Sequence, residues 1–85
     1  MEFTDMMRAE KESEDDYKIV YRYGHLAYGN TMTGKLSVTK SEYPSISTIQ
    51  LEDGYETRVN EMRIGTKIIM DHLQTGEWPE KTRLV

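Results

Sequence analysis

The 85-residue sequence contains no cysteine. A disulfide framework, a thiolate zinc site, an iron–sulfur cluster and a cysteine nucleophile are therefore excluded. Its two histidines lie far apart and lack the close spacing of metal-binding motifs. We expect no metal site and no cofactor.

Long apolar runs and a targeting segment are also missing. No apolar stretch approaches the roughly 18 residues of a membrane span. The start, MEFTDMMRAEKESEDD, is acidic and lacks the basic and apolar parts of a signal peptide. The composition, with 36% hydrophobic and 31% charged residues, is polar but retains periodic apolar segments. These features predict one small soluble, cytoplasmic domain that makes no contact with a membrane.

Catalytic motifs are scarce. The sequence has no glycine-rich phosphate loop, no GxSxG elbow and no SxxK pair. The pair Asp71-His72 could orient an imidazole, but a general base also needs a substrate pocket around it. We therefore predict no catalytic residue and no enzyme. An enzyme subunit with Asp71-His72 at a shared interface is kept as a third hypothesis.

Positive charge is sparse, and negative charge is concentrated at the start of the chain. The net charge is −4, and residues 1–17 hold seven acidic but two basic residues. This balance argues against binding to duplex nucleic acid. The acidic segment is either a solvated tail or an arm that docks on a partner or on a second copy of the chain.

The clearest structural signal lies in residues 17–39. The segments YKIVYRY and GKLSVT both alternate apolar and polar residues, as strands with one buried face do. Gly29-Asn30 predicts a two-residue turn, which would pair Tyr23 with Leu36. A longer loop that spans the flanking glycines is the alternative.

The second half of the chain is less clear. Helix or irregular structure is slightly favoured over a strand for 42–51. A strand over 57–64 and a helix that starts at Thr66 are predicted, with Gly76 just past the helix end. The alternative is one helix through the intervening glycine. It rests on the 3-4-3-4 spacing of Val59, Met62, Thr66, Ile69 and Leu73.

These patterns predict a small single-domain α+β fold. Its antiparallel sheet has three to four strands and is built on the 17–39 hairpin, with one or two helices on one face. An acidic N-terminal arm, mobile or a short helix, occupies residues 1–16 and precedes the α+β domain at 17–76. An extended tail at 77–85 follows, with Trp78 as an anchor against the sheet.

Tyrosine is the most informative residue type for function, because it offers a large, stiff and amphipathic contact. Tyr21 and Tyr23 are assigned first to the small core and second to a protein-contact face. The predicted partner-binding set consists of Tyr21, Tyr23, Tyr28, Arg22, Glu12, Glu14, Asp15 and Asp16.

We accordingly predict a non-enzymatic protein-binding module: a regulator, adaptor or inhibitor that contacts another protein. A homodimer is a further expectation, because a small core gains stability from a second subunit. The profile is typical of small regulatory proteins, including those of phages and other mobile elements. The alternative is weak binding of single-stranded nucleic acid through stacking on Tyr21 and Tyr23.

Overall fold

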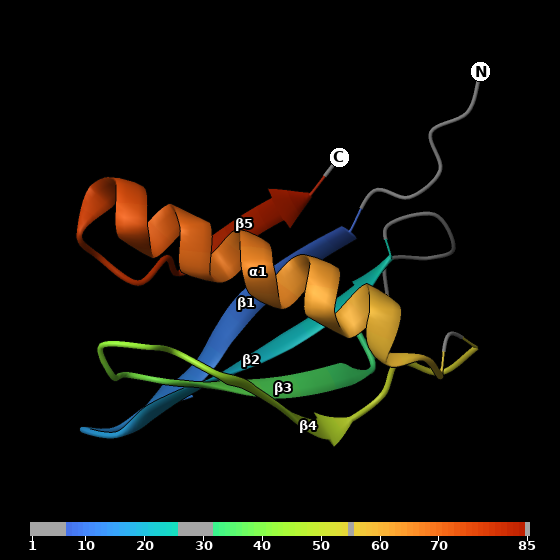
Figure 1. Ribbon diagram of the computed structural model, residues 1–85. Coiled ribbons are helices and arrows are strands. Elements are labelled where there is room, and N and C mark those ends of the chain that lie inside the picture. The colour runs from blue at the N-terminus through green and yellow to red at the C-terminus, as the bar shows by residue number, and fades with distance from the viewer. Residues whose placement is uncertain (1–6, 26–31, 55, 85) are drawn as a thin grey trace.

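The computed structural model describes residues 7–25, 32–54 and 56–84. The described chain forms a five-stranded antiparallel sheet and one helix, and α1 (Arg58–Thr75) crosses one face of the sheet (Figure 1). The strands are β1 (Met7–Glu14), β2 (Lys18–His25), β3 (Gly34–Thr39), β4 (Ile46–Gln50) and β5 (Lys81–Leu84). Their order in the sheet is β4-β3-β2-β1-β5. This arrangement confirms an α+β fold with a β-hairpin, with one strand more than the sequence predicts.

The predicted hairpin exists, with a register two residues from the expected one. Tyr23 pairs with Gly34 and Tyr21 with Leu36. A shift of two residues keeps each side chain on its predicted face, because side chains alternate along a strand. A Cβ atom at Gly34 would lie 2.4 Å from the ring of Tyr23, so this register lets that ring pack over the glycine. The predicted turn at Gly29-Asn30 lies outside the described residues.

The predicted acidic arm differs most from the structure. Residues 7–14 form β1, which pairs with β2 on one side and β5 on the other. Met7 and Ala9 are fully buried, so this segment contributes to the core. Its alternation of small or apolar and charged residues is short and is broken by a bulge after Lys11, which explains why the sequence pattern was weak.

The second half also differs from the favoured prediction. Residues 46–50 form strand β4, and 57–64 lie mostly within α1, which runs through Gly65 as the alternative proposed. A Cβ atom at Gly65 would lie 2.6 Å from Cδ1 of Ile46, so the glycine lets the helix approach β4 closely. The tail at 77–85 contains the edge strand β5.

The ends of α1 are set by local chemistry. The Thr57 side chain accepts a hydrogen bond from the backbone N–H of Val59, which satisfies one free donor of the first turn. Gly76 adopts φ 83° just past the last turn, and its N–H donates to the carbonyl of His72. The predicted helix end at Gly76 is therefore confirmed.

The core lies between α1 and the sheet. Its fully buried apolar side chains come from β1, β2, β3 and the inner side of α1: Met7, Ala9, Ile19, Tyr21, Tyr23, Leu36, Val38, Ile64 and Ile68. The other face of the sheet has no helix over it in the described chain. The molecule thus presents two different outer surfaces, the solvent side of α1 and the helix-free face of the sheet.

Candidate functional site

The predicted partner-binding residues do not gather on one surface. Tyr21 and Tyr23 have no exposed area beneath α1, so in this fold their side chains offer no surface to a partner. Arg22 is exposed on the helix-free face of the sheet. Tyr28 lies outside the described residues. The tyrosine-rich face of β2 is therefore its inner face, and stacking of bases on Tyr21 and Tyr23 has no geometric support.

Two of the predicted acidic residues are held in ion pairs. Glu12 lies 3.1 Å from Nζ of Lys35. Glu14 accepts hydrogen bonds from Lys11 at 2.8 Å and from Lys40 at 2.7 Å. These hydrogen bonds lower the pKa of Glu14 to about 2. The two carboxylates thus join β1 to its neighbouring segments within the chain.

The other two predicted acidic residues lie in the turn between β1 and β2. Asp15 Oδ1 accepts the backbone N–H groups of Tyr17 and Lys18 at 2.7 and 2.9 Å. These two bonds lower the pKa of Asp15 and close the hairpin. Asp16 is exposed in the same turn. The acidity of this segment is therefore explained largely by hairpin geometry.

The two histidines have separate structural environments. His25 is buried, and its Nδ1 lies 2.7 Å from Oε1 of Glu52, while its backbone N–H donates to Oε2 of Glu52 at 2.7 Å. This pair connects the end of β2 to the segment after β4. Within the described ranges, no group of three or more histidine, aspartate and glutamate side chains could hold a metal ion.

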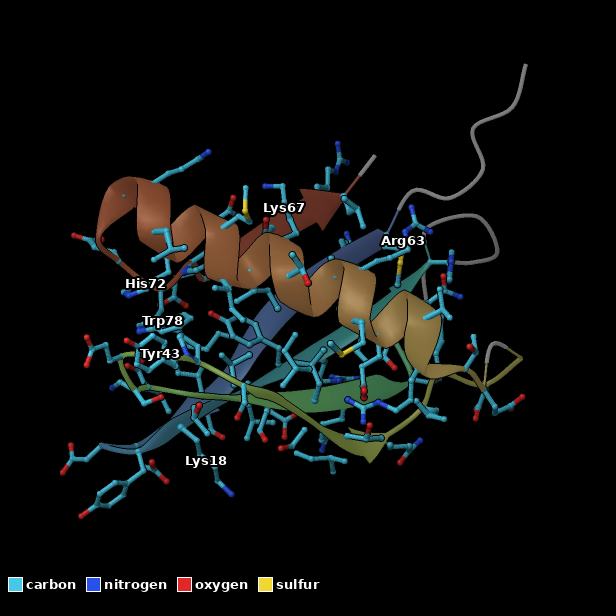
Figure 2. The ribbon with its side chains drawn as sticks, in the orientation of Figure 1. Lys18, Tyr43, Arg63, Lys67, His72 and Trp78 are labelled. Atoms are coloured by element: carbon cyan, nitrogen blue, oxygen red, sulfur yellow. The ribbon has the colours of Figure 1, made fainter. Side chains whose placement is uncertain are left out.

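The neighbouring Asp71 and His72 do not interact as a catalytic pair would. The His72 ring stacks on Trp78 with centroids 3.8 Å apart and planes 3° from parallel, and both side chains lie beside the end of α1 (Figure 2). Asp71 instead bonds Lys67 Nζ at 2.6 Å and the hydroxyl of Thr82. The Asp71-His72 pair therefore fastens the helix to the chain that follows it.

A row of exposed apolar side chains on α1 is a surface that the predicted set does not include. We call it the α1 stripe: Val59, Met62, Met70 and Leu73. Their exposed fractions are 66%, 42%, 48% and 70%. At 3.6 residues per turn they fall within an arc of about 80°, opposite the buried Ile64 and Ile68. Stripes of this kind usually face a core or a partner.

The sequence did carry a signal for this stripe. Three of its members, Val59, Met62 and Leu73, belong to the 3-4-3-4 series that supports one long helix. Periodicity alone does not say which of two apolar sides of a helix faces the sheet. Ile64, Gly65 and Ile68 form the inner side, because the small Gly65 permits close approach.

Basic side chains flank the α1 stripe. Arg58 bonds the buried carboxylate of Glu61 through Nε at 3.0 Å. Lys67 is paired with Asp71. Arg63 makes a hydrogen bond to Asn60 at 3.4 Å, and no ion pair of Arg63 is present in the described part of the chain. The surroundings of the stripe therefore carry positive charge that is only partly neutralised.

The fold and these surfaces define a small α+β domain with an apolar helix face on one side and a charged sheet face on the other. Comparisons with protein-family models, with curated proteins and with solved structures found no match. In the part of the chain that the structure describes, no helix is both long and apolar enough to cross a membrane.

Proposed function

We propose that the protein is a non-enzymatic protein-binding module, a regulator, adaptor or inhibitor, and that it docks its partner on the α1 stripe. The observation that carries the proposal is the row of four exposed apolar side chains on the solvent side of α1. Burying the exposed half or so of a side chain of this size stabilises a complex by roughly 1–2 kcal/mol. Four such side chains in one row are sufficient anchors for a specific contact, since a few residues carry most of the binding energy.

The partner that fits is an acidic amphipathic helix of another protein. An apolar side of such a helix would lie along the α1 stripe and bury it. Acidic residues at its margins would meet Arg63, which has no ion pair among the described residues, and the partly neutralised Arg58 and Lys67. Charge complementarity of this kind would fix the register and speed association.

The experiment is site-specific photo-crosslinking in host lysate. A photoreactive amino acid replaces Thr66, which lies exposed in the middle of the α1 stripe, and in a control chain it replaces exposed Ser41 in the β3–β4 connection. The expected result is a protein crosslinked from position 66 and absent from position 41, mapped by mass spectrometry to an acidic amphipathic helix. The same crosslink should weaken about tenfold in Leu73→Ser and in Arg63→Glu.

A matched control separates this contact from general surface stickiness. Tyr43→Ser removes an apolar side chain of 82% exposure that belongs to the β3–β4 connection and not to the α1 stripe, and it should leave the crosslink unchanged. Because the stripe residues are exposed, these variants should stay within about 0.5 kcal/mol of the parent in unfolding free energy. Crosslinking only to a second copy of the chain, or equal loss in Tyr43→Ser, would contradict the proposal.

A further inference from the structure

The helix-free face of the sheet carries a charge opposite to that of the whole chain. Six bases and two acids lie on this face: Lys18, Arg22, Lys35, Lys81, Arg8, Arg83, Glu10 and Glu12. Residues that pair directly across antiparallel strands point to the same face, so the register assigns all but one of these side chains. Glu12 is the bulge residue, and its ion pairs with Arg22 and Lys35 place it on the same face. Figure 2 shows Lys18 pointing away from α1. A net positive surface thus stands on a chain of net charge −4.

The bases differ in how well they are neutralised. Arg22 and Lys35 share Glu12, at 3.9 and 3.1 Å. Arg8 and Arg83 lie directly opposite each other on β1 and β5. In the described ranges neither has an ion pair or a hydrogen bond from its side chain, and Nε of Arg8 is buried without a partner. Like charges placed directly opposite in a sheet are destabilising, so an anion between these arginines would relieve repulsion.

The two arginines also border a hollow. It has a volume of about 350 Å³ and is lined by Arg8, Ala9, Glu10, Lys81, Thr82 and Arg83. This volume is at the lower end of small-molecule sites, which run from about 300 to 1,000 Å³. Lys81 lies directly opposite Glu10, so that carboxylate has a base beside it. The hollow therefore combines two guanidinium groups and an ammonium group at one end of the sheet.

We propose that this β1–β5 hollow binds the phosphate group of a small phosphate monoester. Guanidinium groups bind phosphate oxygens in pairs, with short charge-assisted hydrogen bonds. A compact ligand fits better than a polyanion, because a long strand laid across the face would meet the carboxylates of Glu10 and Glu12. Glu10 beside the arginines can accept a hydrogen bond from a ligand hydroxyl, which favours a sugar phosphate. The site lies on the sheet face away from α1 and is independent of the α1 stripe.

The test is a titration monitored by amide NMR shifts at low salt, with ribose 5-phosphate, inorganic phosphate and ribose as separate probes. The expected result is that ribose 5-phosphate and phosphate shift the amides of β1 and β5, whereas ribose alone does not. Arg8→Gln and Arg83→Gln should each weaken binding about tenfold. The matched control Lys18→Gln makes the same change of charge on the same face, away from the hollow, and should change affinity less than twofold.

A second measurement does not depend on the ligand. Without ligand, Arg83→Gln should unfold at the same or a higher denaturant midpoint than the parent, because it removes the opposed charge. No shift with phosphate or ribose 5-phosphate at millimolar concentration would overturn the proposal. So would tighter binding of a 12-nucleotide thymidine strand that weakens equally in all three variants, since that result would show a polyanion bound along the whole face.

Discussion

At the scale of single residues, the two tyrosines of β2 are equally buried, but their hydroxyl groups differ in hydrogen bonding. Tyr21 donates its hydroxyl to the carbonyl of Pro79 at 2.7 Å and so connects β2 to the segment after α1. The hydroxyl of Tyr23 is buried beside the backbone of Glu52 but forms no hydrogen bond of good geometry with a described residue. Burial raises the pKa of Tyr23 to about 12 and that of Tyr21 above its ordinary value, so both remain neutral phenols at pH 7.

The two tyrosines therefore make a matched pair for mutation. Tyr21→Phe should lower the free energy of unfolding by about 1 kcal/mol, because it removes a hydrogen bond and leaves the carbonyl of Pro79 without its donor. Tyr23→Phe should change the free energy of unfolding by about 0.5 kcal/mol or less, because it removes a buried hydroxyl that has no hydrogen bond of good geometry. Urea unfolding of the two variants beside the parent measures both values. A larger loss in Tyr23→Phe than in Tyr21→Phe would contradict this prediction.

The sequence correctly predicted which side chains of β2 are buried, but not the register of β2 against β3. Alternation placed Ile19, Tyr21 and Tyr23 on one face, and they do share the buried face. The pattern did not determine which strand partner each would have, because a two-residue shift leaves the faces unchanged. The pairing of Tyr23 with Gly34 depends on the ring packing over a residue without a side chain.

At the scale of elements, α1 is fastened to the edge strand β5 by a small polar cluster. Asp71 bonds Lys67 at 2.6 Å and also the hydroxyl of Thr82. Figure 2 places the labelled Lys67 on the β5 side of the helix. Burial raises the pKa of Asp71, but the hydrogen bonds from Lys67 and Thr82 and the charge of Lys67 together outweigh it, so the pKa is lowered from 3.8.

This cluster predicts a dependence of stability on pH. A carboxyl group whose pKa is lower in the folded chain stabilises the fold above its unfolded pKa and loses that contribution as the pH falls through the folded value. Asp71→Asn should therefore unfold at lower urea concentration than the parent at pH 7. The difference between the two urea midpoints should become smaller from about pH 4 downward. The measurement is a series of urea titrations between pH 7 and pH 2.5.

The control for this series is Glu42→Gln, an exposed residue for which the structure gives no ion pair with another described residue. The urea midpoint of this variant should differ from that of the parent by the same small amount at every pH in the series. If the difference in urea midpoint between Asp71→Asn and the parent is also constant, or grows as the pH falls, the Asp71 carboxylate does not couple α1 to β5.

Elements were predictable where local chemistry defines them and were missed where it does not. The helix end at Gly76 follows from a local preference for a left-handed residue. The first half of α1 was predicted as a strand, and the 57–64 segment does contain three β-branched residues, Thr57, Val59 and Ile64. Its helical state depends on Gly65 and Ile46, which are 19 residues apart and meet only in the folded chain.

At the scale of the whole molecule, part of the predicted N-terminal arm belongs to the sheet. Residues 7–14 supply β1, which lies between β2 and β5, and among the described strands β5 pairs with β1 alone. The backbone N–H of Lys11 also donates to the carbonyl of Glu80 at 2.8 Å. The N-terminal segment thus connects the hairpin half of the protein to its C-terminal end, as Figure 1 shows.

Deleting residues 1–16 should therefore abolish cooperative unfolding, because it removes the strand that two others need.

Ala9→Asp should lower the free energy of unfolding by about 3 kcal/mol or more, since it buries a charge in the core. Ser13→Asp, on the exposed part of the same strand, should change it by less than about 0.5 kcal/mol. Circular dichroism melts compare the three chains. A deleted chain that still unfolds cooperatively would show that β1 is a dispensable arm.

The sequence by itself determined what depends on composition and on neighbours along the chain. The lack of cysteine excluded thiol chemistry, alternation defined the inner face of β2, and Gly76 ended the helix. Each of these follows from the chemistry of one residue or from a period of two. The α+β class could be read from the same local signals.

The tertiary structure alone decided what depends on contacts between distant segments. It placed residues 7–14 between β2 and β5 in the sheet and left the α1 stripe facing solvent. It also set Arg8 opposite Arg83, which are 75 positions apart. The local sequence of a marginal strand, or of a helix with apolar residues on two sides, does not determine what the segment packs against. The packing of the whole chain makes that choice, because only burial against a partner segment distinguishes the alternatives.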